Sequence, residues 1–193
     1  PFVYMSALEN GLQPNSLILD APFVLDQGKA LGKWKPENYG KKFYGPSTLR
    51  KGIENSRNLM TIRIAQYLGM DRITELAERT NIMSNMPPVL SMALGAGETS
   101  LIKLTSAYAS LANGGKKVES SIIDRIQDRR GKNIFILDQA ICENCSQPYI
   151  EENPKPKIIN NTEIIFDEVN AYQMVSILKG AVDRGTGRKT KIE

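Results

Sequence analysis

The chain has 193 residues, of which 41% are hydrophobic and 24% charged, values typical of a globular domain with a sizeable core and not of a disordered chain. Its net charge of +4 comes from interspersed lysines and arginines, without the concentrated basic stripe of a nucleic-acid-binding protein. Because the chain contains no histidine, Ser-His-Asp catalysis and His-ligated metals are excluded, and proton transfer would use lysine, carboxylate or hydroxyl groups.

The first 46 residues combine a helix with a long irregular segment. Apolar residues over 2–9, followed by Asn10 and Gly11, predict a helix with a C-terminal cap. Repeated Pro, Gly and Asn over 12–46 predict turns instead of regular structure. A loop of this length is typically functional or packed by its own aromatic side chains. The aromatic residues available for such packing are Phe23, Trp34, Tyr39, Phe43 and Tyr44.

Two helices are predicted next, joined by a sharp corner. Ser47 is a suitable N-cap for a helix that ends near Asn55. Ser56 is a suitable N-cap for the following helix, whose apolar residues recur at helical spacing up to Gly69. The two helices would therefore meet at residues 55–58.

Two further helices are predicted before residue 115. Asp71 opens a short helix, which carries Ile73, Leu76 and Ala77 on one face. Residues 95–99 resemble part of a phosphate-binding loop but lack its Gly-Lys-Ser/Thr ending, so we interpret them as a tight turn. Thr99 or Ser100 caps the second helix, which ends at 113–115. Its predicted apolar stripe comprises Leu101, Leu104, Tyr108 and Leu111.

The last third of the chain predicts strands and then one more helix. Period-two alternation over 122–137, around the turn residues 128–131, predicts a β-hairpin. A polar excursion follows over 139–160, and a short strand is predicted over 162–166. Asp167 caps the final helix. This helix carries the apolar residues Val169, Tyr172, Val175, Leu178 and Val182. The predicted fold class is α+β, a helical body with a strand pair beside it.

Cys142 and Cys145 form a C-x-x-C pair within the polar excursion. The sequence has no second pair, so a zinc site with four cysteine ligands cannot form within this chain. The polar neighbours indicate a loop. We expect a small structural disulfide in an oxidising compartment, while two free thiols and redox catalysis stay open as alternatives.

Ser56, Arg57 and Asn58 form a Ser-x-Asn motif at the predicted corner between two helices. Alone, the motif is weak, because Ser and Asn are both favoured as helix N-caps. A helix cap is therefore the simplest interpretation of these three residues taken by themselves.

The flanking sequence changes this interpretation. Residues 45–69 read GPSTLRKGIENSRNLMTIRIAQYLG and resemble the segment around the second active-site motif of class A penicillin-binding proteins. Further stretches resemble segments of the same family in order and spacing: PFVYMSALENG at 1–11, the Trp-x-Pro-x-Asn stretch at 34–39, LGAGETSLIKLTSAYASLANGG at 94–115 and RGTGRK at 184–189. The resemblance runs nearly from end to end.

The resemblance implies a partial serine β-lactamase/penicillin-binding-protein transpeptidase fold over 1–193, with a variable insertion around 139–160. Family members place Ser-x-x-Lys, Ser-x-Asn and Lys-Thr-Gly around one cleft. The first motif would end just before Pro1 and the third would follow Glu193, so neither lies in this chain. Residues 189–191 (Lys-Thr-Lys) lack the glycine of the third motif.

By the same resemblance, Ser56 would relay a proton between the lysine of the first motif and the leaving amine. Asn58 would hydrogen-bond that lysine and the substrate's amide backbone, a task that suits an amide because it both donates and accepts. Arg57, as the middle residue, would point outward. No cofactor and no metal are expected.

The resemblance also implies an expected function. The parent protein would be a D,D-transpeptidase on the periplasmic side of the bacterial inner membrane. It would cross-link peptidoglycan stem peptides through an acyl-serine intermediate and bind β-lactams, without a nucleic-acid partner. Class A members also carry a glycosyltransferase domain and an N-terminal membrane anchor, which would be the only contact with the membrane and lies outside this chain.

The alternative expectation is that the chain as given is a catalytically inactive structural or binding fragment. It lacks the nucleophile, and core faces covered in the parent protein would be exposed. We therefore expect these faces to aggregate or to pair with another chain.

Overall fold

The computed structural model describes residues 1–29, 32–137, 140–146, 155–159 and 162–191. It divides into two compact units. The first, Pro1–Val118 with Ile165–Glu193, we call the helical body, and the second, Glu119–Ile164, we call the strand unit. The fold class is α+β, as predicted.

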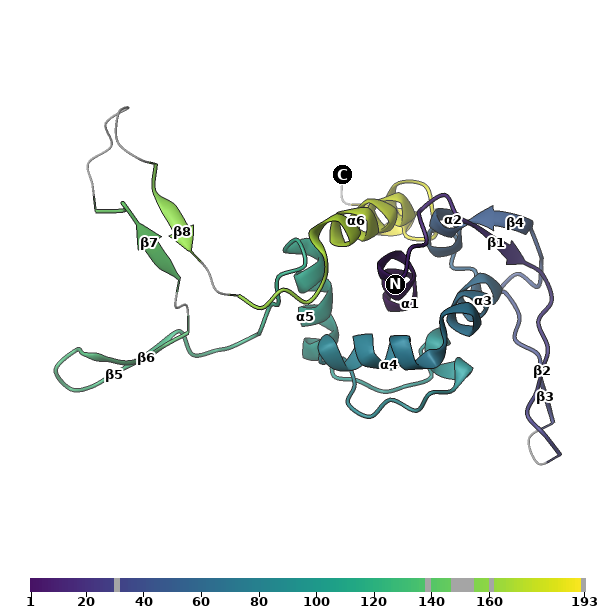
Figure 1. Cartoon of the computed structure of the whole chain (residues 1–193), viewed down its shortest axis with the longest axis horizontal. Coiled ribbons are helices and arrows are strands. Elements are labelled where there is room, and N and C mark those ends of the chain that lie inside the picture. Colours follow the sequence, from purple (N-terminus) through teal and green to yellow (C-terminus); the bar gives the residue numbers. More distant parts are fainter. Residues whose placement is uncertain (30–31, 138–139, 147–154, 160–161, 192–193) are drawn as a thin grey trace. The chain divides into compact units, whose positions relative to one another are not determined.

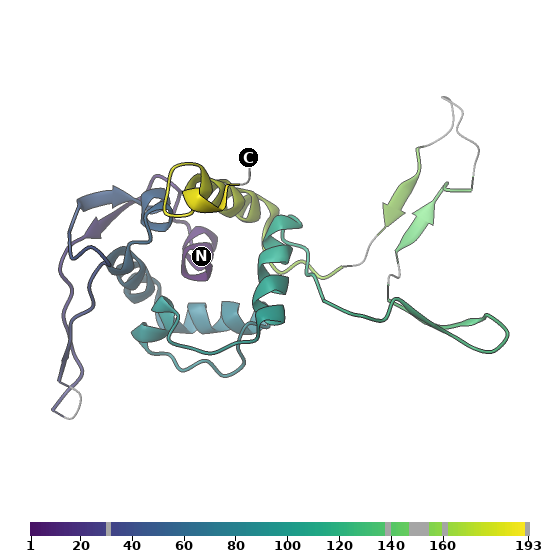
Figure 2. The ribbon, with the colours of Figure 1, turned by 180° about the vertical axis from the view of Figure 1, so that it is seen from behind.

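The helical body is arranged around its first helix, α1. In Figure 1 and, from behind, in Figure 2, α1 lies in the middle and the other helices surround it. The helices are α1 (Phe2–Glu9), α2 (Leu49–Glu54), α3 (Asn58–Leu68), α4 (Met70–Arg79), α5 (Leu101–Ala112) and α6 (Glu168–Asp183), with the short 3-10 helices η1 (Leu90–Leu94) and η2 (Arg188–Thr190). Six of the eight residues of α1 are buried, as expected for a helix that is apolar on every side.

The core forms where α1 meets α3, α4 and α6. Met5, Ile64 and Met174 are fully buried there. The predicted face of α4 is confirmed, because Ile73, Leu76 and Ala77 are all buried. Among the described residues, no helix combines the length and the apolar composition needed to cross a lipid bilayer.

The segment predicted as irregular contains two strand pairs. β1 (Leu17–Asp20) pairs antiparallel with β4 (Gly45–Thr48), and β2 (Leu25–Asp26) pairs antiparallel with β3 (Lys33–Trp34). Both are two-stranded sheets, in which every strand is an edge that tolerates proline. Strands this short do not produce a periodic pattern, which is why the sequence did not reveal them.

The predicted aromatic packing of this segment is only partly correct. The rings of Phe23 and Trp34 meet edge to face with centroids 6.3 Å apart. Tyr39 and Phe43 are exposed and do not pack as expected.

Helix caps confirm some predictions and correct others. The Ser100 hydroxyl caps α5 by accepting the backbone N–H of Lys103. The Asp167 carboxylate caps α6 by accepting the N–H groups of Val169 and Asn170. The predicted cap Ser47 is wrong, because Ser47 belongs to β4 and the hydroxyl of Thr48 accepts the N–H of Lys51 instead.

The apolar residues named for the last helix do not make up the buried face of α6, although Leu178 packs against the core. Val169, Tyr172 and Val175 are exposed, and the buried face comprises Ala171, Met174, Ile177 and Gly180. Small residues select this face because they permit close approach. A Cβ atom at Gly180 would overlap the carboxylate of Glu54, which belongs to α2. The stripe predicted for α5 fails in the same way at Leu101, which is exposed.

The strand unit contains two antiparallel strand pairs. β5 (Arg125–Gln127) pairs with β6 (Asn133–Ile136), and β7 (Ile141–Glu143) pairs with β8 (Lys157–Ile159). The predicted hairpin is therefore confirmed, and the Asp128 carboxylate holds its turn by accepting the N–H groups of Arg130 and Lys132. The predicted strand over 162–166 is wrong, because no strand of two or more residues forms there. The expected variable segment 139–160 lies within this unit, partly outside the described residues.

Candidate active site

The predicted motif lies at the corner between α2 and α3, and its backbone conformation is unusual. The N–H of Ser56 donates to the carbonyl of Ile53 (3.0 Å), and the N–H of Arg57 donates to the carbonyl of Gly52 (2.8 Å). This pair of bonds is a Schellman motif, which places Ser56 where a glycine is usual. Ser56 has φ 51°, a left-handed conformation that costs an L-residue roughly 1–2 kcal/mol.

The prediction that Ser56 caps α3 is therefore wrong. Arg57 occupies the N-cap position and provides no side-chain cap. The backbone N–H of Leu59 instead donates to the Oδ1 atom of Asn38, which lies 21 residues earlier in the chain (3.2 Å). The hydroxyl of Ser56 has no hydrogen-bond partner among the described residues, and it is left available for a ligand.

Asn58 is half-buried and presents its amide at the same corner. Its Nδ2 atom donates to the carbonyl of Glu37 (3.0 Å). This contact uses one N–H of the amide. Within the described part of the chain, the Oδ1 atom and the second N–H of Asn58 stay free to bind another group.

Arg57 does not point outward, contrary to the expectation. Its guanidinium lies 3.4 Å from the ring centroid of Tyr44, and its Nε atom lies 4.0 Å from the Oδ2 atom of Asp20. The side chain is only 19% exposed. A cation over an aromatic face and beside a buried carboxylate is attracted by both, so Arg57 turns into the protein and away from solvent.

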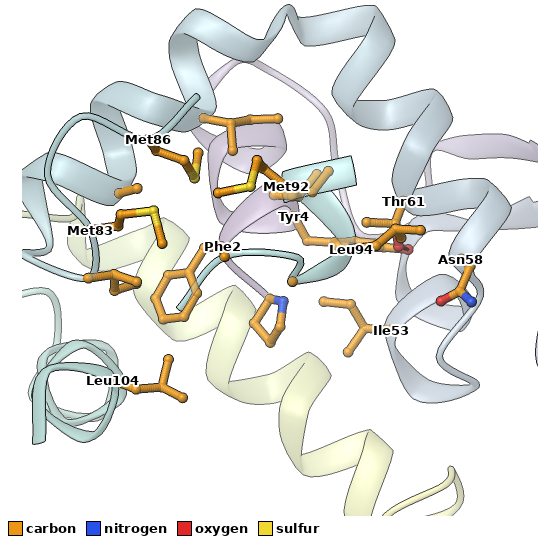
Figure 3. A pocket seen from close by; sticks show the side chains of 18 of the residues that line it. Phe2, Tyr4, Ile53, Asn58, Thr61, Met83, Met86, Met92, Leu94 and Leu104 are labelled. Carbon is orange, nitrogen blue, oxygen red and sulfur yellow. Dashed lines mark hydrogen bonds between the residues drawn. The ribbon is translucent and has the colours of Figure 1, made fainter. Parts of the chain in front are cut away.

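A cavity of about 550 Å³ adjoins this corner, lined by Ser56 and Asn58 among others. Figure 3 shows Asn58 and Thr61 on one side of it and the methionines Met83 and Met86 on the other. Pro1, at the start of α1, also lines the cavity. Polar groups capable of binding an amide thus lie at one end of the cavity, and flexible thioethers lie at the other.

Tyr4 lines the cavity and also belongs to the buried core. Its hydroxyl pairs with that of Thr61 (3.2 Å). Burial raises the pKa of Tyr4 to about 12, the hydrogen bond with Thr61 works against this increase, and the nearby carboxylate of Asp20 adds to it. The Tyr4 hydroxyl also occupies the space where a Cβ atom on Gly52 would lie, so α2 approaches α1 closely at this point.

The other flank of the corner is fixed by charge. The carboxylate of Glu54 is buried and accepts two hydrogen bonds from the guanidinium of Arg184. The carbonyl of Glu54 accepts the backbone N–H of Thr186 (2.9 Å), and Thr186 lines the cavity. The loop after α6 is therefore tied to the residues that immediately precede Ser56.

Comparison with known families places the chain in one of them. The family model described as "Penicillin binding protein transpeptidase domain" matches residues 1–193. The chain belongs to this family. It is 43% identical over 196 residues to penicillin-binding protein 1A of Rickettsia conorii, a match that covers 98% of this chain and 24% of the relative. Penicillin-binding protein 1A of Neisseria flavescens is 35% identical over 190 residues, 97% of this chain and 22% of the relative.

A solved structure extends the agreement to the transpeptidase fold. The crystal structure of penicillin-binding protein 1A from Haemophilus influenzae superposes with a TM-score of 0.78 at 32% identity, covering 97% of this chain and 29% of that one. The predicted partial transpeptidase fold is therefore confirmed. The chain spans about a quarter of the length of the curated penicillin-binding proteins it matches.

Within this transpeptidase domain, the structure brings Ser56 and Asn58 to one cavity and places the cysteine pair elsewhere. Cys142 and Cys145 belong to the strand unit, with Cα atoms 5.7 Å apart, within the range of roughly 4.4–6.8 Å that a disulfide spans. Among the described residues, no group of three or more Cys, Asp or Glu side chains could hold a metal ion. Sequence reasoning missed the contacts of Asn38 and Glu54, because both join residues far apart in the chain.

Proposed function

We propose that this chain is part of a serine-type D,D-transpeptidase that cross-links peptidoglycan stem peptides through an acyl-serine intermediate and is acylated by β-lactams. The conformation of Ser56 carries the proposal. A serine held at φ 51°, with an unused hydroxyl at a cavity, is costly for the fold. Strained residues of this kind concentrate at functional sites.

The nucleophile would enter the cavity from a Ser-x-x-Lys segment preceding Pro1. Pro1 lines the cavity at the start of α1, so a helical turn before it would bring side chains close to Ser56 and Asn58. A serine hydroxyl needs an adjacent base, here a deprotonated lysine. The oxyanion hole would use backbone N–H groups of the nucleophile and of the third-motif strand, which also lies outside the chain.

The two residues of this chain would have separate roles. Ser56 relays a proton between the lysine and the leaving amine. The free Oδ1 atom of Asn58 accepts a hydrogen bond from the lysine, and its second N–H donates to the amide backbone of the substrate. The donation from Asn58 to the carbonyl of Glu37 keeps the amide in this orientation.

The parent protein would act on the periplasmic side of the bacterial inner membrane, with an N-terminal anchor and a glycosyltransferase domain outside this chain. Its partners would be stem peptides and β-lactams. The 193-residue chain alone would be catalytically inactive, and its exposed apolar side chains would make it self-associate. Leu101 and Tyr172, 81% and 75% exposed, support this second part of the proposal.

Labelling with a fluorescent penicillin tests the proposal. In the full-length protein, Ser56→Ala should slow acylation by about 10²- to 10⁴-fold, the usual contribution of a positioned proton-transfer group. Ser56→Gly should slow acylation equally while stabilising the corner by roughly 1–2 kcal/mol, because glycine adopts φ 51° without strain. The 193-residue chain should remain unlabelled.

Three outcomes would contradict parts of this proposal. Wild-type acylation rates in both Ser56 variants would show that the hydroxyl relays no proton. A labelled serine within residues 1–193 would place the nucleophile in this chain. A full-length wild-type protein that no penicillin acylates would remove the proposed function altogether.

A further inference from the structure

We propose that Asn38 is a positioning residue, which holds Ser56 and Asn58 in their working arrangement by capping α3 from a distant loop. The inference rests on the proposed function and adds to it a residue that does not line the cavity. It starts from the hydrogen bonds of a single buried amide.

The side chain of Asn38 is buried, with 4% of the residue exposed. Its Nδ2 atom donates to the Oδ1 atom of Asp20 (2.7 Å) and to the carbonyl of Lys42 (2.9 Å). Its Oδ1 atom accepts the N–H of Leu59 (3.2 Å). Both donors and the acceptor are thus engaged, and because each partner lies on a different segment, the amide fixes three segments together.

The contact with Leu59 has a direct consequence for Ser56. The first N–H groups of a helix lack intrahelical partners and are usually satisfied by a serine, threonine, asparagine or aspartate side chain at the N-cap. In α3 the N-cap residue Arg57 supplies none, and Asn38 takes this role. The Ser56 hydroxyl is therefore not needed as a cap and remains at the cavity.

A second contact connects Asn38 to the amide of Asn58. Glu37 immediately precedes Asn38, and its carbonyl accepts the Nδ2 hydrogen bond of Asn58 (3.0 Å). Two consecutive loop residues therefore bind two consecutive residues of α3, Glu37 to Asn58 and Asn38 to Leu59. Loss of the Asn38 contact would let the loop shift, and the carbonyl that orients the Asn58 amide would shift with it.

Asp20 explains why an asparagine serves here. The residue is completely buried, its Oδ2 atom has no hydrogen-bond partner in the described part of the chain, and Arg57 lies 4.0 Å from that oxygen. A buried carboxylate is costly unless it is paired and hydrogen-bonded. Only a side chain that donates to Asp20 and also accepts from Leu59 satisfies both neighbours, and an amide does this.

The test uses the full-length protein and the rate of acylation by a fluorescent penicillin. Asn38→Ala removes all three hydrogen bonds and should slow acylation about 10- to 100-fold, the effect of a small displacement of reacting groups. It should also displace the pH profile of acylation, because the lysine that Asn58 contacts would lose its fixed partner. Asn133→Ala, at an exposed asparagine of the strand unit whose side-chain hydrogen bond with Gln127 stays within the hairpin, is the matched control and should leave the rate and profile unchanged.

A swapped double variant provides the rescue. In Asn38→Asp with Asp20→Asn, the donor and the acceptor exchange places, the Leu59 N–H keeps an acceptor, and the net charge of the pair is unchanged. The Lys42 carbonyl loses the donor that it has in the wild type and faces the new carboxylate, so acylation should recover only in part, to a rate between those of Asn38→Ala and wild type. If Asn38→Ala does not fold, Asn38→Ser takes its place, with the same expected direction for both rate and pH profile.

The inference fails if Asn38→Ala acylates at the wild-type rate, or if its slower rate comes with an unchanged pH profile and matches a reduced fraction of folded protein. Failure of the proposed function would give a different result. In that case the wild type would not be acylated, or Ser56→Ala would have no effect on acylation.

Discussion

The helical body and the strand unit use similar apolar residues in opposite ways. In the body, Met174 and Ile177 of α6 are fully buried between helices. In the strand unit, Ile134 of β6 and Ile141 of β7 are 69% and 62% exposed, and every residue of β5, β6 and β7 is exposed. Apolar composition alone therefore does not show which unit contains the core. The two units differ in whether a second layer of structure covers the apolar side chains.

The difference follows from architecture. A ring of helices around α1 encloses side chains from several directions, whereas a two-stranded sheet leaves both of its faces open. An isolated pair of strands is marginally stable in water. Short-range hydrogen bonds stabilise the strand unit instead, such as those that the Asp128 carboxylate accepts in the hairpin turn. We expect substitutions to be costly in the body and tolerated in the strand unit.

The largest expected effect contrasts one apolar residue from each unit. Met174→Ala should destabilise the body by roughly 2–5 kcal/mol, because it leaves a cavity at a fully buried position. Ile134→Ala, at an exposed position, should change local stability by less than about 0.5 kcal/mol. Hydrogen–deuterium exchange of the full-length protein, followed on peptides from α1, α6 and β6, measures both. If the two substitutions destabilised the protein equally, the proposed difference between the units would be wrong.

A second prediction concerns pH and is confined to the body. The pKa of Tyr4 is raised by burial to about 12, whereas an unfolded tyrosine ionises near pH 10. The native state therefore keeps a proton that the unfolded state releases, and stability falls as the pH rises from about 10 to about 12. At 1.36 kcal/mol per unit, the loss reaches roughly 2.7 kcal/mol.

In Tyr4→Phe, stability should no longer fall between about pH 10 and pH 12. The substitution also removes the hydrogen bond with Thr61 (3.2 Å), which contributes about 1 kcal/mol at neutral pH. A tyrosinate absorbance titration of this variant should lose the ionisation step near pH 12. Tyr39→Phe, at an exposed tyrosine, should keep that step. A step near pH 12 that persists in Tyr4→Phe would refute the assignment.

Local sequence signals predicted much of this fold, and they failed where distant residues decide. The Asn10–Gly11 cap, the Asp167 cap and the 128–131 turn were confirmed, because each depends on neighbours within a few residues. The Ser56 cap failed because Asn38, 21 residues earlier than Leu59, already fills that role. No local window contains this information.

The same reasoning explains which face of α6 is buried. Tyr172 is exposed, whereas the structure buries Met174 and Ile177 together with Ala171 and Gly180, and the small size of the last two lets α6 approach its neighbours. At the candidate site, too, the sequence predicted some features and not others. The sequence pointed to Ser56 and Asn58 through a family resemblance, but it could not supply the left-handed backbone of Ser56 or the inward turn of Arg57.

The smallest expected effect belongs to the strand unit. We propose that Cys142 and Cys145, whose Cα atoms lie 5.7 Å apart, form a disulfide. Closing so short a loop stabilises it by about 2 kcal/mol in the chain-entropy model, and this gain should stay local. Reduction should speed hydrogen exchange of peptides covering 140–146 and leave α1 and α6 unchanged, while a double Cys142→Ser, Cys145→Ser variant should not respond to reductant. Mass spectrometry without reductant that counts two free thiols would disprove the disulfide, and faster exchange in α1 upon reduction would show that the two units are coupled.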